Sequence, residues 1–199
     1  MTMTDQPATA RHAVDAIVIG ASAGGIDALL KILSGLRQDY RLPVIVVLHL
    51  RDDRDSRLAE VFSQHVGMTV KQAQDKEPVS AGVLYFAGPG YHLSIETDFR
   101  FSLSGEDPVH FSRPAIDLLM SSAADAYGNR LAGILLTGAN EDGADGLASI
   151  KAAGGLTIVQ DPQEAQVSVM PQAAIRRRLP DHILRLQEIR QLLTELGQS

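Results

Sequence analysis

The pattern of apolar residues divides the chain into short runs and longer segments with helical spacing. The short runs are rich in Val, Ile and Leu and carry little charge, which is typical of strands that are buried on both faces. Turn residues separate most of these runs from the next segment of the chain. The predicted strands are Ala16–Ile19, Val44–Leu48, Val83–Ala87, Leu131–Leu136, Leu156–Val159 and His182–Leu186.

The segments between these runs repeat apolar residues every three to four positions, as amphipathic helices do. They are Ile26–Leu36, Arg57–His65, a helix that starts at Ser112 and Pro114 and ends at Tyr127, a helix that ends at Ala153, and Glu188–Leu196. Strands that alternate with helices of this length predict a mainly parallel sheet with right-handed crossovers. The predicted fold class is therefore α/β, a three-layer, doubly wound sheet covered by helices on both faces.

The middle of the chain, Thr69–Leu103, departs from this alternation because turn residues break its apolar runs. Such a pattern predicts strands and hairpins instead of further strand–helix units. Leu93–Ile95 and Phe99–Leu103 are the two arms of an expected hairpin. We therefore expect a short antiparallel excursion from the parallel sheet.

Composition favours a single globular domain. The chain has 199 residues, of which 45% are hydrophobic and 21% charged, and this length suits one core. Residues 1–13 are polar and predict a flexible tail, which leaves 14–199 for the folded domain. The chain contains neither the run of about 18 apolar residues that a membrane span needs nor the apolar segment of a signal peptide. We expect a cytoplasmic protein without membrane insertion.

Charge and cysteine content exclude several kinds of partner and site. The net charge is −6, and the only basic run, Arg176–Arg178, is typical of a solvated helix end, so nucleic acid is not an expected partner. The chain has no cysteine, which excludes disulfides and thiolate sites. His-x-x-x-His spacing and clusters of histidine with carboxylates are absent, so no metal is expected.

The first strand leads into a glycine-rich turn. Gly20–Gly24 fits the G-x-S-x-G pattern of a nucleophile elbow, in which glycines allow a tight strand-to-helix turn that exposes the serine. Ser22 is thus a candidate nucleophile, and the free N–H groups at the start of the next helix suit an oxyanion. A plain structural turn is the alternative. A dinucleotide-binding turn is disfavoured because Ser22 replaces its second glycine, and a P-loop because Ile26 and Asp27 replace its Lys and Ser or Thr.

Three residue types that acyl transfer requires follow three of the predicted parallel strands. Ser22 follows the first strand, His49 the second, and Asp142 lies in the loop after Leu131–Leu136, so all three should project from the sheet edge where such folds bind ligands. His49 would accept the proton of Ser22, and Asp142 would orient the imidazole. The order Ser, His, Asp differs from that of the α/β-hydrolases, so the sequence predicts a convergent triad.

Each member of this triad also has a structural interpretation. His49 could be a structural histidine at a strand end, and Asp142 a turn or helix-cap residue. Asp145 is the better candidate for the N-cap of the following helix, which frees Asp142 for another role. His92, in the hairpin region, is an alternative base.

Several motifs, taken in order, resemble the catalytic domain of CheB, the chemotaxis-receptor protein-glutamate methylesterase. The resemblance covers residues 14–196 and rests on the glycine-rich turn, the strand that ends at His49, Gly88–His92, Arg113–Asp117, Leu136–Ala144 and Met170-Pro171. By motif, the family's serine, histidine and aspartate fall on Ser22, His49 and Asp142. The resemblance implies hydrolysis of glutamate γ-methyl esters on the helical cytoplasmic domain of chemoreceptors, with glutamine deamidation as a second activity and no cofactor.

The chain departs from the family's usual residues around this site. It has Ala23 instead of Thr after the serine, Leu48 and Leu50 instead of Gln and Met around the histidine, Ala115 instead of Ser, and Gly138–Asn140 instead of Gly-Met-Gly. Backbone donors survive such changes, so Ala23 and Ala139 are expected to supply N–H groups to the oxyanion. The absence of the family's Met side chain at the position of Ala139 is expected to reshape the pocket.

Typical members of the family also carry an N-terminal receiver domain whose phosphorylation controls the esterase. The residues before Asp15 are too few for such a domain. We therefore expect an esterase that is active without phosphorylation, with any regulation supplied by a separate protein. The competing functions are a small-molecule esterase or amidase with the same triad, and a catalytically silent binding module with the same fold.

Overall fold

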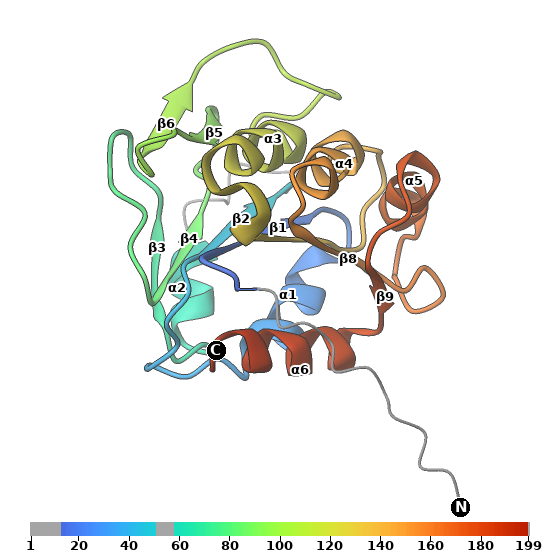
Figure 1. The fold of residues 1–199 in the computed structure, drawn as a ribbon, viewed down its shortest axis with the longest axis horizontal. Coiled ribbons are helices and arrows are strands. Elements are labelled where there is room, and N and C mark those ends of the chain that lie inside the picture. Colours follow the sequence, from blue (N-terminus) through green and yellow to red (C-terminus); the bar gives the residue numbers. More distant parts are fainter. Residues whose placement is uncertain (1–12, 51–57, 199) are drawn as a thin grey trace, which may run out of the picture.

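The computed structural model describes residues 13–50 and 58–198, and its centre is a seven-stranded sheet (Figure 1). All strand pairs in this sheet are parallel, and the strand order is β3-β4-β2-β1-β7-β8-β9. The strands are β1 (Ala16–Ala21), β2 (Val44–Leu48), β3 (Thr69–Gln72), β4 (Val83–Phe86), β7 (Leu131–Leu135), β8 (Leu156–Gln160) and β9 (His182–Leu184). The mainly parallel α/β sheet that the hydrophobic pattern predicts is confirmed.

The central strand β1 is buried on both faces. Ile17 and Ile19 belong to the core cluster on one face of the sheet, and Ala16 and Val18 to the cluster on the other. From β1 the chain passes to β2 on one side and later returns to β7 on the other, so the direction of winding reverses between β1 and β7. In α/β sheets such a reversal leaves a ligand-binding crevice at the carboxyl ends of the strands.

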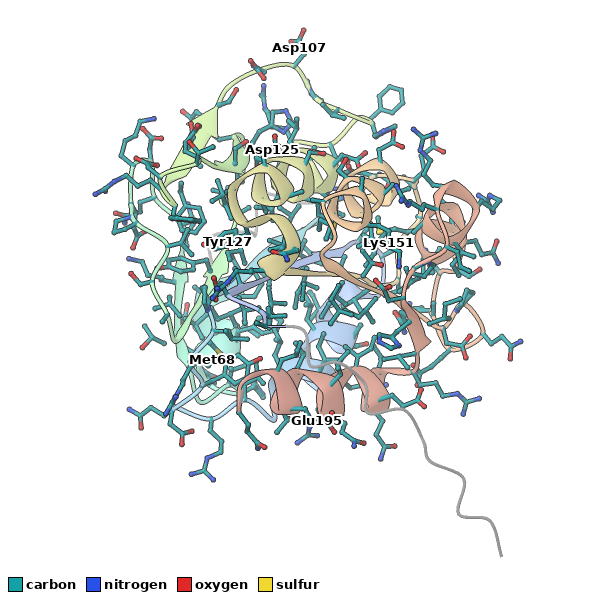
Figure 2. All side chains as sticks on the ribbon, in the orientation of Figure 1. Met68, Asp107, Asp125, Tyr127, Lys151 and Glu195 are labelled. Carbon is teal, nitrogen blue, oxygen red and sulfur yellow. The ribbon has the colours of Figure 1, made fainter. Side chains whose placement is uncertain are left out.

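Helices cover both faces of the sheet, as expected for three layers (Figure 1). One face carries α1 (Gly25–Leu33), α2 (Leu58–Ser63) and α6 (Leu186–Leu196). The other carries α3 (Ile116–Tyr127), α4 (Ala144–Ala152) and α5 (Val169–Arg177), and a short 3-10 turn, η2 (Gly128–Arg130), follows α3. Side chains fill the space between the helices and the sheet (Figure 2).

A separate two-stranded sheet contains β5 (His92–Ile95) and β6 (Phe101–Ser104), which pair antiparallel. This pair confirms the predicted hairpin excursion. The peptide N–H of Ile95 donates a hydrogen bond to the Ser122 hydroxyl of α3 at 3.1 Å, so the hairpin packs on that helix.

Three details of the fold differ from the sequence prediction. β3 and β4 pair parallel at one edge of the main sheet, without a helix between them, instead of forming a hairpin. Of the helix α5, only a helix end at Arg176–Arg178 is predicted, because polar and small residues dilute the apolar face of the rest. α3 begins at Ile116, later than Ser112 and Pro114 predict. Residues 1–12 of the expected tail, and the loop 51–57, lie outside the described residues.

Candidate active site

The loops at the carboxyl ends of β1, β2 and β7 continue the hydrogen bonding of the sheet. His49 donates its peptide N–H to the carbonyl oxygen of Ala21 at 3.0 Å, and Ser22 donates its peptide N–H to that of Thr137 at 3.0 Å. These bonds hold the three loops side by side. Ser22, His49 and the loop that contains Asp142 therefore lie at the same edge of the sheet, where the sequence pattern predicts them.

The turn after Ser22 depends on two glycines. Gly24 has a φ of 79°, in the left-handed region that favours glycine. A Cβ atom on Gly25 would lie 2.5 Å from the Leu48 Cδ1 atom and 2.8 Å from the Ala21 Cβ atom, closer than such atoms approach. Because α1 begins at Gly25, the positive end of its dipole lies next to Ser22.

His49 and Asp142 form a close pair. The Nε2 atom of His49 lies 3.0 Å from the Oδ2 atom of Asp142, although its N–H direction is bent away from a linear hydrogen bond. The side chain of His49 is 12% exposed, and that of Asp142 is fully buried. A histidine that faces a cavity and is backed by a buried carboxylate has the arrangement of a general base and its orienting acid.

The carboxylate of Asp142 is held in its charged form. Its Oδ2 atom accepts the peptide N–H of Ile116 at 2.7 Å, and its Oδ1 atom accepts that of Asp117 at 2.9 Å. Burial alone would raise the pKa of Asp142, but the contact with His49 and these two N–H groups outweigh it, so the pKa lies below its ordinary value. A carboxylate that stays charged at neutral pH can stabilise an imidazolium.

The orientation of His49 decides which ring nitrogen can take up a proton. Nε2 faces Asp142, so Nδ1 is the nitrogen on the side away from the carboxylate. The hydroxyl oxygen of Ser112 lies 3.5 Å from Nδ1. Ser22 and His49 line one cavity. In the described part of the chain, 13–50 and 58–198, no hydrogen bond joins their side chains. Catalytic hydrogen bonds are often long before substrate binds.

This cavity has a volume of about 470 Å³, in the range typical of ligand sites. It collects residues from four different loops. Its lining includes Ser22, Ala23, His49, Leu50, Ala139 and Gln166. Four of the five residues of the predicted site thus face one space, and Asp142 lies behind His49.

Ala23 and Ala139, whose peptide N–H groups are the predicted oxyanion donors, both line this cavity. Among the described residues, no acceptor takes a hydrogen bond from the N–H of either alanine. The Thr137 hydroxyl donates to the carbonyl oxygen of Ala23 at 2.8 Å and accepts the peptide N–H of Val167 at 2.9 Å, which fixes the backbone beside both positions. Fixed, unengaged N–H groups beside a serine are what an oxyanion requires.

His92 has a different environment from His49. It is fully buried, its Nδ1 atom accepts the peptide N–H of Ala115 at 3.1 Å, and its Nε2 atom lies 3.0 Å from the carbonyl oxygen of Asp107. Asp107, labelled in Figure 2, lies on the outer loop above the helix that Figure 1 labels α3. Because His92 is fully buried and is not part of the cavity lining that contains Ser22, the geometry favours His49 over His92 as the base.

The sequence prediction is wrong about the N-cap of α4. Gly143 occupies that position, and Asp145 lies in the first turn of the helix, where its carboxylate pairs with Arg177. The N–H groups at this helix start are instead bonded by Asp117, which is distant in sequence. Arg176 and Arg177 form the last turn of α5, in agreement with a solvated helix end.

Four residues near the site are not predicted as functional candidates from the sequence. Ser112 contacts the ring of His49, Thr137 bonds the turn after Ser22, Gln166 lines the cavity and Asp117 binds the loop of Asp142. Ser112 precedes the Arg113–Asp117 motif and Asp117 is its last residue, so their position in or beside that motif is the available signal. Thr137 lies inside the Leu136–Ala144 motif, but the sequence does not show that its side chain contacts Ala23. Gln166 lies in none of the motifs, and its place at the cavity depends on loops that only the fold brings together.

The described part of the chain offers neither a cluster of metal ligands nor a membrane-spanning helix. No group of three or more His, Cys, Asp or Glu side chains in it is arranged to hold a metal ion. None of its helices combines the length and the apolar character that crossing a bilayer requires.

Comparison with known proteins identifies the family of the chain. The family model described as CheB methylesterase matches residues 17–193. The chain belongs to the CheB methylesterase family. In the crystal structure of the Thermotoga maritima CheB methylesterase catalytic domain, 31% of aligned residues are identical and the TM-score is 0.87, with 92% of this chain and 98% of that one covered. The predicted fold, family and hydrolase class are therefore confirmed.

Curated CheB relatives differ in length. A Leptospira interrogans protein, named for both methylesterase and glutaminase activities, is 42% identical over 93% of this chain and 96% of its own length. The protein-glutamate methylesterase/protein-glutamine glutaminase 2 of Anaeromyxobacter dehalogenans is 40% identical over 92% of this chain, but over 53% of its own length. The chain thus matches nearly all of one relative and about half of the other.

Proposed function

We propose that the chain is a protein-glutamate methylesterase that hydrolyses glutamate γ-methyl esters on the helical cytoplasmic domain of chemoreceptors. The observation that carries this proposal is that His49 lies 3.0 Å from the buried Asp142 and lines the same cavity as Ser22. The names of the relatives support the same reaction. Since the substrate segment is cytoplasmic, the reaction takes place in the cytoplasm.

Ser22 is the nucleophile in the first half of the reaction. Its hydroxyl oxygen bonds to the ester carbonyl carbon while its proton passes to Nδ1 of His49, the nitrogen that does not face Asp142. Asp142 stabilises the imidazolium that results. The N–H groups of Ala23 and Ala139 bind the negative oxygen of the tetrahedral intermediate. Nδ1 then returns the proton to the methoxy oxygen, the carbon–oxygen bond breaks and methanol leaves.

A water molecule completes the reaction. It gives a proton to Nδ1 of His49 and attacks the acyl-Ser22 ester, and the second tetrahedral intermediate uses the same two N–H groups. Its collapse breaks the bond to Ser22, whose oxygen regains the proton, and releases the free glutamate side chain. The same steps convert glutamine to glutamate with ammonia as the leaving group, and neither reaction uses a cofactor.

The test compares substrates. Purified protein is given a methyl-labelled chemoreceptor cytoplasmic fragment and, separately, small esters such as p-nitrophenyl acetate, and methanol or nitrophenol release is measured. Contacts with the receptor around the ester should raise kcat/KM by about 10²-fold or more over the small esters. Hydrolysis of small esters alone would favour a small-molecule esterase. Binding of the fragment without hydrolysis of either substrate would favour a silent binding module.

A further inference from the structure

Two buried carboxylates bind each other's helices. Asp117 lies in the first turn of α3, and Asp142 lies in the loop that precedes α4. Asp142 accepts the peptide N–H groups of Ile116 and Asp117, at 2.7 and 2.9 Å. In return, Oδ1 of Asp117 accepts the peptide N–H groups of Gly143 and Gly146, at 2.9 and 2.7 Å. The N-cap residues of both helices, Ala115 and Gly143, make no side-chain cap of their own.

Asp117 therefore contacts Asp142 from two sides. The peptide N–H of Asp117 bonds the carboxylate of Asp142, and the carboxylate of Asp117 bonds the peptide N–H of Gly143, the next residue in the chain. Both the side chain and the backbone at Asp142 are thus tied to one residue. The backbone at Gly143 is held in an unusual form, with a φ of 99°.

Packing leaves this turn little freedom. A Cβ atom on Gly143 would lie 2.5 Å from Leu135 Cδ1 and 2.7 Å from Ile116 Cγ2. The turn must therefore either keep its present path or move α3 and β7 with it. Displacements of the order of 1 Å at a catalytic group can lower a rate about 10²-fold. The hydrogen bonds of Asp117 act on the segment where such a displacement would matter.

The charge on Asp117 is unfavourable for the fold. Burial raises the pKa of its carboxyl to about 6, and the nearby Asp142 and Asp145 carboxylates act in the same direction, against the N–H groups of Gly146 and Gly143. The Nε2 atom of His110 lies 3.3 Å from Oδ2 of Asp117, and its Nδ1 atom lies 4.0 Å from Glu141. A neutral residue could satisfy the same N–H groups at lower electrostatic cost. The hydrogen bonds from Gly143 and Gly146 to Asp117 are therefore formed in spite of an electrostatic cost.

We propose that Asp117 is a positioning residue for catalysis, which holds the start of α4 so that Asp142 stays within hydrogen-bonding distance of His49. This inference rests on the proposed function, because it assigns Asp117 to the same Ser22, His49 and Asp142 site. The carboxylate of Asp117 bonds the backbone at the start of α4, outside the lining of the cavity, and acts through Asp142.

A double-mutant cycle tests the proposal with a small ester as substrate. Asp117→Ala should lower kcat about 10- to 100-fold with KM changed less than about twofold, because the loss is in the orientation of the base. In an Asp142→Ala background the same substitution should change kcat less than about twofold, because the residue through which Asp117 acts is gone. Asp117→Asn keeps an acceptor oxygen for Gly143 and Gly146 and should retain kcat within about threefold.

The contrary results are equally specific. An unchanged kcat in Asp117→Ala, or the same fold-loss with and without Asp142, would show that Asp117 only supports the fold. If Asp117→Ala does not fold, Asp117→Leu, which also lacks an acceptor oxygen but leaves less empty space, replaces it in the cycle, and an equal fold-loss with and without Asp142 would overturn the proposal.

A spectroscopic readout separates this proposal from the function itself. In protein with ¹⁵N-labelled histidine, the Nε2 resonance of His49 should shift in Asp117→Ala in the same direction as in Asp142→Ala. An unchanged resonance would contradict the positioning role even if the wild-type protein hydrolysed no ester. Absence of ester hydrolysis with a shifted resonance would instead contradict the proposed function alone.

Discussion

The hydroxyl of Thr137 donates a hydrogen bond to the carbonyl oxygen of Ala23 across 2.8 Å. This bond joins the turn after β1 to the loop after β7, two segments that the sheet brings together although they are far apart in sequence. It fixes the peptide plane between Ala23 and Gly24, in the turn that follows Ser22. Thr137 is buried, which limits the access of solvent water to this bond.

We expect Thr137→Val to impair both stability and turnover. The substitution keeps the shape of the side chain but leaves the carbonyl of Ala23 and the N–H of Val167 without this partner, which should lower the free energy of unfolding by about 1 to 3 kcal/mol. The looser elbow should lower kcat on the order of tenfold. Urea unfolding and ester kinetics measure the two effects, with Thr137→Ser, which keeps a hydroxyl, as the control. Equal kcat in the two variants would show that the bond does not support the site.

Much of the fold can be predicted from the sequence, because strands that are buried on both faces of the sheet consist of continuous apolar runs. Short apolar runs such as Val44–Leu48, which alternate with segments of helical spacing, indicate buried parallel strands. Because β1 and β2 are parallel, the residues that follow them, Ser22 and His49, lie at the same edge of the sheet. The glycine turn can be predicted for a different reason. Gly24 needs a left-handed backbone conformation that residues other than glycine rarely adopt.

The parts that could not be predicted depend on tertiary contacts. The parallel pairing of β3 with β4 has no helix between the strands to indicate it. A local rule assigns the cap of α4 to Asp145, whereas the actual acceptor, Asp117, comes from another helix 26 and 29 residues away from its donors. Pattern rules consider neighbours in sequence and cannot find such a partner.

The two candidate bases should separate by pH profile. Only a neutral imidazole accepts a proton from serine, so activity should rise with pH as the base loses its proton. The rise, and about 10³-fold or more of the turnover, should disappear in His49→Ala. In His92→Ala the rise should persist while the melting temperature falls, because two hydrogen bonds of a buried ring are lost. The reverse pattern would assign the base to His92.

The raised pKa of Asp117 predicts how stability depends on pH. The folded protein holds this proton up to about pH 6, whereas the unfolded chain releases it near the ordinary value of 3.8. Between these values the folded state binds more protons, so the free energy of unfolding falls as pH rises from about 4 to about 6. The wild-type protein should therefore lose stability relative to Asp117→Asn across this window. Urea unfolding of both proteins at several pH values measures the difference, and a constant or rising difference would refute the prediction.

The lowered pKa of Asp142 acts in the opposite direction. Its contribution to stability is present above the ordinary carboxyl range and is lost as pH falls below about 4, when the folded carboxylate takes up a proton. Comparing Asp142→Asn with the wild type in the same experiment therefore provides an internal check of sign. The wild type should gain stability relative to Asp142→Asn as pH rises, the reverse of the Asp117 comparison.

The most direct test of the account is methanol release by the wild-type protein and by Ser22→Ala from the same methyl-esterified receptor fragment. If Ser22 is the nucleophile, the variant should lose activity by a factor on the order of 10⁴ or more, because the triad acts as a unit. Its melting temperature should stay within about 2 °C of the wild-type value, because a hydroxyl at a cavity wall adds little to the core. Methanol release near the wild-type rate by a normally folded Ser22→Ala protein would contradict the assignment of Ser22, His49 and Asp142 as a catalytic triad.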